Sequence, residues 1–556
     1  MKGTIFFSSR FFPTRTGWLL VAALMSAMTS AVVGTEHILP SEIYPESVRT
    51  SQYVIVRDGT RLAIDIYRPA ENGVAVDKRF PVILVATPYH RSSENNGEII
   101  TFLAPQGNHR SIFGELLKHG YIIASLDIRG RGASFGTVYA GGFENDVNRW
   151  DLYDVVEWLA TQPWSSGNIG MGGCSYVAKT QFWAASVMPP HLKAIAPSGS
   201  PFDTYALLRV NGITQIPDFE KLDRSLQVLD TTFLSAPVDG DKTGALRQMA
   251  VNEHRISWDG GLAGVTAARA DRPFRDSVWS HPEYAYSLSP EWSFINNYRI
   301  SGIPVFQFAG WRDFVVDHSL AWYRNLAREA VPQRLIIGPW YHCEWDQSDL
   351  VDAVSEYLRW YDYWLKGVQN GLMDGPRIRY FVNGAPVGRE WRAANRWPLP
   401  NQTLKTHFLT GTANNDRGHR GALGQERPGG SHPVDHYTVD YSVTTVDLAA
   451  RFFWGIPNLS DPGLKPIEMA AIDGKPITYT SAPLTQDAEV TGFPVVTLWV
   501  SSTAHDQDFF VYLEEVDESG NSTLMTEGMI RASNRATRDA PYDNQGLPWH
   551  PSMARD

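Results

Sequence analysis

Asn168-Ile-Gly-Met-Gly-Gly-Cys-Ser175-Tyr176-Val-Ala-Lys-Thr-Gln181 is the stretch of this chain that decides its fold. It predicts the end of a strand (residues 169–172), a tight turn that carries Ser175, and a helix over residues 177–186. A serine on a strand-to-helix turn is exposed above the sheet, over the positive end of the helix. Serine alone is a poor nucleophile, so a catalytic interpretation requires a base and an orienting acid elsewhere in the chain.

The segments around this turn predict an α/β fold. Strand-like and helix-like segments alternate over residues 48–200, and the continuous apolar run at 81–86 is typical of a strand buried on both faces. Residues 201–295 interrupt the alternation with helical pieces and clustered aromatic residues, and it returns over residues 296–370. We therefore expect one mostly parallel sheet with helices on both sides, into which residues 201–295 are inserted as a helical cap.

The base and the acid follow two later strands. Asp313 comes after the apolar run 304–309, and His342 comes after the run 334–338. Chemistry in open parallel sheets gathers at the carboxyl ends of the strands, so these side chains can converge on Ser175. The order Ser, Asp, His along the chain is that of α/β-hydrolases.

These residue types predict the roles of a catalytic triad. His342 would take the proton of Ser175 during attack on a carbonyl, and Asp313 would hold the imidazole in the useful tautomer. The oxyanion of the intermediate needs donors. The backbone N–H of Tyr176 is one, and the loop that carries Tyr89 offers a phenol as a second.

Residues 371–556 change to short strand-like runs separated by Gly, Pro, Asn and Asp. The runs at 377–382, 495–500 and 509–516 are examples. This spacing predicts a C-terminal β-sandwich domain.

Residues 1–33 carry the features of an export signal. Three basic residues precede a short apolar run at 17–25, and small residues follow at 29–31, as a signal peptidase requires. We therefore expect an exported protein, periplasmic or secreted, with no membrane association once the signal is removed. Removal of those three basic residues takes the formal net charge from −11 to −14.

The two cysteines flank the candidate site residues. Cys174 precedes Ser175, and Cys343 follows His342. Neighbours of catalytic residues usually point away from the site, so the sequence favours two buried thiols and leaves a Cys174–Cys343 disulfide as the alternative. Two cysteines are too few for a disulfide framework.

Composition excludes other classes. A nucleic-acid-binding face needs a surplus of basic residues, and the formal charge of −11 argues against a nucleic acid partner. No group of His, Cys, Asp and Glu has the spacing of metal ligands, so neither a metal nor another cofactor is expected. The 19 Trp favour large apolar contacts or an aromatic-lined cleft.

The chain resembles the CocE/NonD (cocaine-esterase-like) serine hydrolases, which are related to the Xaa-Pro dipeptidyl-peptidases and the α-amino acid ester hydrolases. The resemblance extends from about Val54 to Ser533, with its motifs in the family's order. Those motifs are Asp58-Gly59, Asp65-Ile-Tyr-Arg-Pro69, Thr87-Pro-Tyr89, Asp127-Ile-Arg-Gly-Arg-Gly132, Trp158-Leu-Ala-Thr-Gln-Pro-Trp164, Gly170-Met-Gly-Gly-Cys-Ser175-Tyr176, Gly310-Trp-Arg-Asp313, Gly338-Pro-Trp-Tyr-His342, Trp364-Leu-Lys-Gly367 and Ser501-Ser-Thr503.

The resemblance implies a serine hydrolase with an α/β-hydrolase core, a helical cap and a C-terminal jelly-roll domain. Ser175, Asp313 and His342 match the family's triad. Tyr89 and the backbone N–H of Tyr176 match its oxyanion hole.

The chain departs from the family pattern in two places. Where the family has glycine two or three residues after the nucleophile, this chain has Val177 and Ala178, followed by Lys179. The family also continues past the region of Ser533 through several more strands. We therefore expect either a truncated product or an incomplete sandwich, whose exposed strand edges favour self-association into a homo-oligomer.

Several substrate classes stay open at this stage. Small acyl esters or amides suit an aromatic-lined pocket under the cap. An Xaa-Pro dipeptidyl-peptidase or an α-amino acid ester hydrolase must pair the substrate's ammonium with carboxylates. The acids Asp218, Glu220 and Asp223 are candidates, although the sequence favours solvated charges on a helix face. The α-amino acid ester hydrolases carry further acids just past the catalytic Asp, where this chain has Phe314-Val-Val316.

Three further alternatives complete the set. A glutaryl-type amidase needs a cation in the pocket, which Arg91 or Arg312 would supply. A non-catalytic binding protein on a hydrolase scaffold conflicts with the intact set of Ser, Asp and His. A metal-dependent hydrolase conflicts with the lack of ligand spacing in the sequence.

Overall fold

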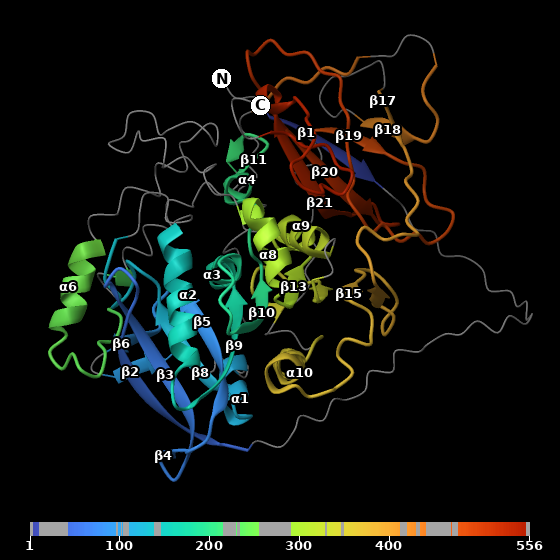
Figure 1. Ribbon diagram of the computed structural model, residues 1–556. Helices are drawn as coiled ribbons and strands as arrows, with labels where there is room; N and C mark the ends of the chain where they lie inside the picture. Colours follow the sequence, from blue (N-terminus) through green and yellow to red (C-terminus); the bar gives the residue numbers. More distant parts are fainter. Residues whose placement is uncertain are drawn as a thin grey trace, which may run out of the picture. The chain divides into compact units, whose positions relative to one another are not determined.

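The computed structural model describes residues 4–10, 43–95, 98–101, 103, 111–137, 146–214, 229–230, 234–254, 291–327, 331–345, 350–411, 420–429, 434–440, 469 and 476–551. The chain forms two compact units (Figure 1). The larger unit comprises Ser41–Pro400, Ala449–Leu464 and Asn534–Asp556. The smaller unit comprises Met1–Pro40, Asn401–Leu448 and Lys465–Ser533.

An 11-stranded sheet forms the centre of the larger unit, in the order β16-β15-β14-β13-β10-β9-β5-β8-β3-β2 with β4 beside β3. Its strands are β2 (Glu46–Ile55), β3 (Arg61–Glu71), β4 (Val74–Ala75), β5 (Phe80–Thr87), β8 (Ile122–Asp127), β9 (Ser165–Cys174), β10 (Leu192–Ser198), β13 (Val305–Gly310), β14 (Gln333–Gly338), β15 (Ile378–Phe381) and β16 (Trp391–Ala394). The run from β8 to β15 is parallel, and antiparallel strands close both edges. Every residue of β5 is buried, as the continuous apolar run predicts.

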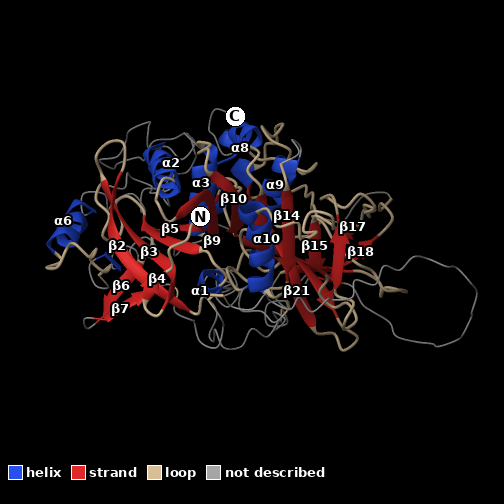
Figure 2. Ribbon diagram, turned by 60° about the horizontal axis from the view of Figure 1, so that its bottom comes forward, coloured by secondary structure: helices blue, strands red, loops and turns tan. Residues whose placement is uncertain are grey.

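Helices cover both faces of this sheet. They are α1 (Ile112–Lys118), α2 (Asp146–Ala160), α3 (Tyr176–Ser186), α8 (Ile295–Ser301), α9 (Val316–Ala327) and α10 (Ala353–Lys366). Figure 2 shows α2, α3, α8 and α9 on one side of the strands, and α1 with α10 on the other. Between α3, α8 and α9, the ring of Phe182 stacks on Trp322 with centroids 3.8 Å apart, and the edge of Tyr298 packs against both. The predicted α/β architecture is confirmed.

The inserted region 201–295 is described in part. It contains α4 (Thr204–Leu208), the short pair β11 (Arg209–Val210) and β12 (Ile213–Thr214), α6 (Ala245–His254) and the 3₁₀ turn η4 (Glu291–Phe294). A second short pair, β6 (Ser92–Asn95) and β7 (Glu98–Thr101), follows β5, and α6 lies near β2 and β6 (Figures 1 and 2). The candidate acids Asp218, Glu220 and Asp223 lie outside the described residues.

The smaller unit contains a six-stranded sheet in the order β17-β18-β19-β1-β20-β21. Its strands are β1 (Thr4–Arg10), β17 (Phe408–Thr410), β18 (Arg420–Gly424), β19 (Ile477–Thr480), β20 (Asp508–Val516) and β21 (Ser522–Arg531), and the turn η6 (Ala532–Asn534) follows. Thr4–Arg10, inside the predicted export signal, pairs in parallel with both β19 and β20. The export signal stays a prediction. In the alternative, residues 4–10 are retained and form an inner strand of the smaller unit's sheet.

Two strand predictions need correction. The run 377–382 is β15, but it extends the large sheet rather than the C-terminal domain. The run 495–500 forms no strand, and Trp499 within it is 91% exposed. β-prone residues form a strand only where a neighbouring strand accepts and donates their backbone hydrogen bonds, and the sequence alone does not identify that neighbour.

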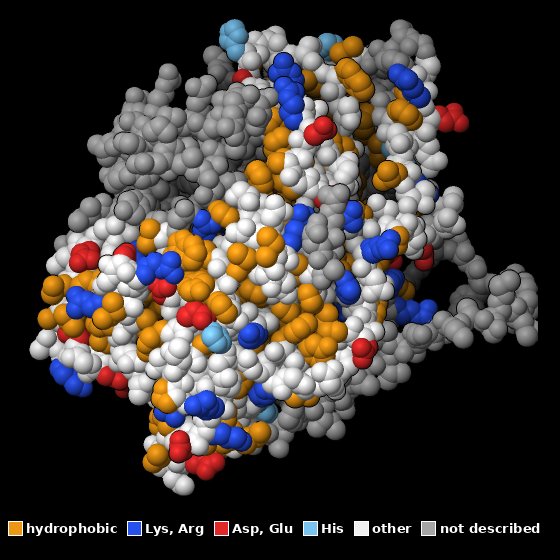
Figure 3. Space-filling view, viewed as in Figure 1, with side chains coloured by type: hydrophobic (Ala, Val, Ile, Leu, Met, Phe, Trp, Pro, Cys, Tyr) orange, Lys and Arg blue, Asp and Glu red, His pale blue; other side chains and the backbone are white. Residues whose placement is uncertain are grey.

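Two features of the described residues bear on partners. They include no helix with the length and apolarity needed to cross a bilayer. On the face drawn in Figure 3, the coloured Lys and Arg side chains are scattered among acidic and apolar ones.

Candidate active site

Ser175 lies between the end of β9 and the start of α3, as the sequence predicts. Its backbone has φ 62° and ψ −125°, a conformation that non-glycine residues rarely adopt. Such strained conformations are common at functional sites. The turn is held because the N–H of Ser175 donates to the carbonyl of Ser198 over 2.8 Å. Glycine is required two residues before Ser175, since a Cβ on Gly173 would lie 2.4 Å from the side chain of Val177.

Asp313 and His342 meet after two adjacent parallel strands. The last residues of β13 and β14, Gly310 and Gly338, are paired in register. His342 Nδ1 lies 2.9 Å from Asp313 Oδ1 and 3.0 Å from Oδ2. An ionised carboxylate only accepts, so Nδ1 carries the proton and Nε2 is left as the basic nitrogen. The buried carboxylate of Asp313 also accepts the N–H of Val315 over 3.0 Å.

Gly199 makes room for this pair. It follows β10 with φ 62°, and an added Cβ would lie 2.9 Å from His342 Cε1 and 3.2 Å from Asp313 Oδ2. Any side chain would therefore displace the imidazole. Sequence reasoning missed Gly199, although its position directly after a buried strand, between two serines, was a signal.

Tyr89 follows β5, and its phenol hydrogen-bonds with the Ser175 side chain and with the backbone N–H of Tyr176. Desolvation raises the pKa of Tyr89, and the bonds to Ser175 and Tyr176 oppose that rise only in part. The phenol therefore stays protonated at neutral pH and can donate. The side chain remains 37% exposed, so a substrate can reach it.

Five neighbouring strands thus contribute to one rim. In sheet order they are β14, β13, β10, β9 and β5, all parallel to their neighbours. The residues that follow their carboxyl ends are His342, Asp313, Gly199, Ser175 and Tyr89. This is the edge at which ligands bind in parallel α/β sheets.

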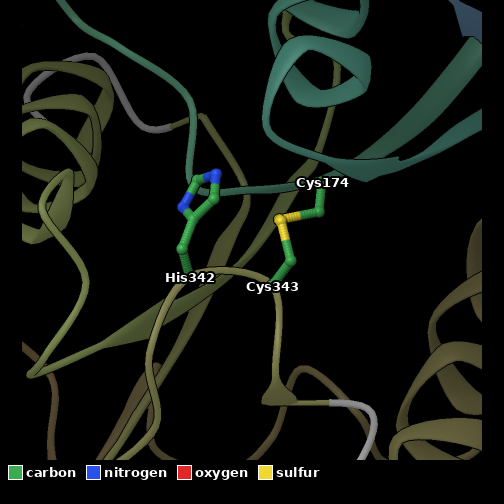
Figure 4. A group of neighbouring side chains, drawn as sticks. All are labelled: Cys174, His342 and Cys343. Atoms are coloured by element: carbon green, nitrogen blue, oxygen red, sulfur yellow. A yellow bond between two sulfur atoms is a disulfide. The ribbon is translucent and has the colours of Figure 1, made fainter. Parts of the chain in front are cut away.

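The cysteine prediction was wrong. Cys174 and Cys343 form a disulfide with Cα atoms 5.8 Å apart, and Figure 4 shows the S–S bond beside His342. The two sulfurs and an imidazole nitrogen also lie within 4.8 Å of one another, a spacing that suits a metal ion. Thiolate is the form of cysteine that binds metals, so the disulfide does not offer that donor set.

Other side chains surround the imidazole. The ring of Phe314 lies 4.5 Å from the ring of His342. Glu344 accepts the N–H of Tyr341 over 3.3 Å. Burial raises the pKa of Glu344, and the charge of Asp313 adds to the rise while His342 opposes it. Sequence reasoning missed this carboxyl.

The candidate cations have different positions. Arg91 is fully buried, with its guanidinium bonded to Asp65 at 2.9 Å and to Asp127 at 2.7 Å. Its charge is compensated inside the protein, so it does not serve as a pocket cation. Arg312 is half-buried and donates to the hydroxyl of Tyr341 over 3.4 Å.

Two family models match this chain. Residues 58–344 match the family model described as X-Pro dipeptidyl-peptidase (S15 family). Residues 370–553 match the X-Pro dipeptidyl-peptidase C-terminal non-catalytic domain.

Two curated relatives cover most of the chain. A Mycobacterium bovis protein named as a serine esterase is 31% identical over 539 residues, 88% of this chain and 82% of its own length. The cocaine esterase of a Rhodococcus species is 28% identical over 522 residues, 88% of this chain and 84% of its own.

Among solved structures, a CocE/NonD family hydrolase from Staphylococcus aureus has a TM-score of 0.58 at 21% identity, covering 92% of this chain and 81% of its own. A likeness at this identity shows the fold.

Proposed function

Since the chain belongs to the X-Pro dipeptidyl-peptidase (S15) family and is a serine hydrolase, we propose that it cleaves small acyl esters or amides through an acyl-enzyme at Ser175. Esters are the preferred class because the relatives with the highest identity quoted above are named as esterases. Phe314, whose apolar ring lies 4.5 Å from the imidazole of His342, also suits a substrate without an ammonium group.

In this mechanism Nε2 of His342 removes the proton of Ser175 while the hydroxyl oxygen attacks the carbonyl carbon. The phenol of Tyr89 and the N–H of Tyr176 donate to the oxyanion. His342 then protonates the leaving group, and water repeats the sequence in the second half-reaction. Asp313 stabilises the imidazolium that forms.

The observation that carries the proposal is the bond between Asp313 and His342 at the rim where Ser175 occupies its strained turn. The disulfide supports it further. It joins the residue before Ser175 to the residue after His342, with Cα atoms 5.8 Å apart.

A panel of p-nitrophenyl acyl esters set against Ala-Pro-p-nitroanilide tests the proposal. We expect turnover of short acyl esters by the wild type and loss of at least about 10⁴-fold in kcat for Ser175→Ala, because the acyl-enzyme can no longer form. A fluorophosphonate probe should label the wild type and not the variant. Equal turnover or equal labelling by both proteins would show that Ser175 is not the nucleophile. A non-catalytic protein or a metal-dependent hydrolase would give that result.

A second candidate activity is Xaa-Pro dipeptidyl-peptidase. The name of the matching family model favours it, and so does Glu344, a half-buried carboxyl beside the imidazole whose pKa is raised. The ammonium of a peptide substrate would pair with Glu344 and compensate the negative charge of its carboxylate form. Preferential cleavage of Ala-Pro-p-nitroanilide, lost in Glu344→Gln, identifies this activity.

We also propose the finer architecture that the resemblance implies: residues 201–295 as a helical cap, and the strands of the smaller unit that follow residue 400 as a jelly-roll domain that associates into a homo-oligomer. Residues 1–33 are proposed as an export signal, which the disulfide supports because such bonds persist in oxidising compartments. N-terminal sequencing of the mature protein checks the export signal, and a chain that still begins at Met1 contradicts it. Light scattering checks the oligomer.

A further inference from the structure

The Cys174–Cys343 disulfide occupies an unusual position for a bond that merely stabilises a fold. Its cysteines are 169 positions apart in sequence, yet each adjoins a residue of the proposed mechanism. Cys174 ends β9 directly before Ser175, and Cys343 directly follows His342. In Figure 4 the side chains of His342 and Cys343 extend from one loop towards the turn that carries Cys174.

The two connected loops are held in different ways. The Ser175 turn is anchored by its N–H bond to Ser198 and by the first turn of α3. The His342 loop turns at Cys343, whose φ is 63°, and its bonds within the loop are long, 3.3 Å and 3.5 Å between Tyr341 and Glu344.

Asp313 orients the ring of His342 from the β13 side. That bond sets the tautomer and the direction of the ring but does not link its loop to β9. The disulfide is a covalent link between the two loops, and so it fixes the separation of the base from the nucleophile.

We propose that the Cys174–Cys343 disulfide is a positioning crosslink of the hydrolytic reaction, which keeps the imidazole of His342 within hydrogen-bond reach of Ser175. This inference rests on the proposed function. Proton transfer needs donor and acceptor within about 3 Å, and a misplacement of about 1 Å can lower the rate about a hundredfold. Reduction therefore slows the chemical step while the groups that bind the substrate stay in place.

The bond can be opened in the folded protein. Both cysteines are half-buried, so a small phosphine can reach them. Tris(2-carboxyethyl)phosphine gives two electrons to the disulfide, the S–S bond breaks, and water supplies the oxygen of the phosphine oxide and the two protons of the thiols. The chain has two cysteines in all, so the reagent acts on one bond only.

The experiment compares oxidised wild type, phosphine-treated wild type, phosphine-treated wild type reoxidised with oxidised glutathione, and the double variant Cys174→Ser, Cys343→Ser. A chelator is present throughout, because the freed thiols and His342 would otherwise bind trace metal. Circular dichroism at the assay temperature identifies the folded samples, and steady-state kinetics on one p-nitrophenyl ester gives kcat and KM.

We expect reduction to lower kcat about 10- to 100-fold with KM changed less than about twofold. Fluorophosphonate labelling of Ser175 should slow in parallel. Reoxidation should restore both rates, and the double variant should show the reduced rate with and without phosphine. A role in stability alone would not move kcat of folded enzyme.

Two results would overturn the inference. One is unchanged kcat in the folded reduced enzyme with only the melting temperature lowered. The other is unfolding of both the reduced wild type and the double variant, which would make the bond a structural one. Failure of the proposed function looks different: the oxidised wild type would then neither hydrolyse the ester nor react with the probe.

Discussion

At the scale of single residues, three of the seven non-glycine residues with positive φ in the described part of the chain lie at the rim of the large sheet. Ser175, His90 and Cys343 all have positive φ without being glycine. Ser175 lies in the turn between β9 and α3, His90 follows Tyr89, and Cys343 follows His342. Such conformations persist only where surrounding contacts enforce them, and they are typical of sites whose geometry is set in advance.

Tyr89→Phe tests the oxyanion role directly. Removal of one oxyanion donor lowers kcat about a hundredfold, and KM should change little because the donor acts mainly on the transition state. Desolvation raises the pKa of Tyr89, so the effect should persist on the alkaline side of neutrality, where an ordinary phenol approaches ionisation.

Tyr341→Phe is the matched control for that variant. Its hydroxyl accepts from Arg312 near the site without contacting Ser175 in any bond described above. Ester kinetics on both variants decide the matter. If Tyr89→Phe keeps more than about half of the wild-type kcat, the phenol is not an oxyanion donor.

Gly199→Ala tests the fit of the imidazole. Both Gly199 and Gly302 have φ near 62°, at 62° and 61°, so alanine strains both backbones equally, by about 1 kcal/mol. The added Cβ meets His342 at 2.9 Å in the first case and nothing within 4 Å in the second. We expect kcat to fall at least about a hundredfold in Gly199→Ala and to stay near wild type in Gly302→Ala. Equal kcat values would show that Gly199 does not position His342.

At the scale of elements, the sequence predicted the loops that follow strands better than the contacts between them. Ser175, Asp313 and His342 were predicted at strand ends because each follows an apolar run closed by glycine. Those signals are local, and the structure brings Asp313 and His342 together as expected. The nucleophile role of Ser175 stays a prediction.

The features that the sequence did not predict depend on contacts between distant residues. Gly199 is one of 46 glycines, and its importance arises from side chains that lie more than a hundred positions away. The disulfide was missed because the direction of the Cys343 side chain depends on a positive φ that no local motif indicates. The sequence left Arg91 as a candidate pocket cation because it does not reveal the partners of that side chain. Those partners, Asp65 and Asp127, lie in β3 and β8.

Asp230 links three elements and gives an element-scale prediction. It lies 2.9 Å from His90 Nε2 and 3.1 Å from His254 Nδ1, and it accepts the N–H of Gly132 over 2.9 Å. His90 adjoins Tyr89, and His254 ends α6. Burial opposes ionisation of Asp230, but the bonds from His254 and His90 outweigh it and lower its pKa. The ionised carboxylate therefore stabilises the fold.

Asp230→Asn should lower the free energy of unfolding by about 2 kcal/mol at pH 7, because an amide leaves one buried donor unmatched. A carboxyl with a depressed folded pKa contributes stability above its unfolded pKa, near 4, and loses it as pH falls through the folded value. The difference from wild type should therefore shrink below about pH 4.

Urea unfolding at a series of pH values measures this difference. Asp154→Asn is the control, because Asp154 pairs with Arg57 at the surface, where such a bond contributes little. A pH-independent difference for Asp230→Asn would contradict the assignment of an ionised carboxylate.

At the scale of the whole molecule, chain order and spatial order differ. Asn534–Asp556 follows the strands of the smaller unit in sequence but belongs to the larger unit. Arg324 pairs with Asp543 at 2.9 Å, and Asn325 bonds to the backbone of Asp543 on both sides, 2.9 Å and 3.1 Å. The ring of Tyr542 packs edge-on against Phe202, with centroids 4.9 Å apart.

Tyr542→Ala should therefore destabilise the larger unit although residue 542 lies near the end of the chain. The ring is half-buried and also contacts Trp292 at 5.7 Å, so its removal should lower the free energy of unfolding by about 2 kcal/mol. Tyr542→Phe keeps the ring and should stay within about 1 kcal/mol of wild type. Esterase activity remaining after incubation in urea reports on the larger unit, because Ser175, Asp313 and His342 all lie in it. If Tyr542→Ala loses activity at the same urea concentration as wild type, the returning segment does not contribute to the stability of that unit.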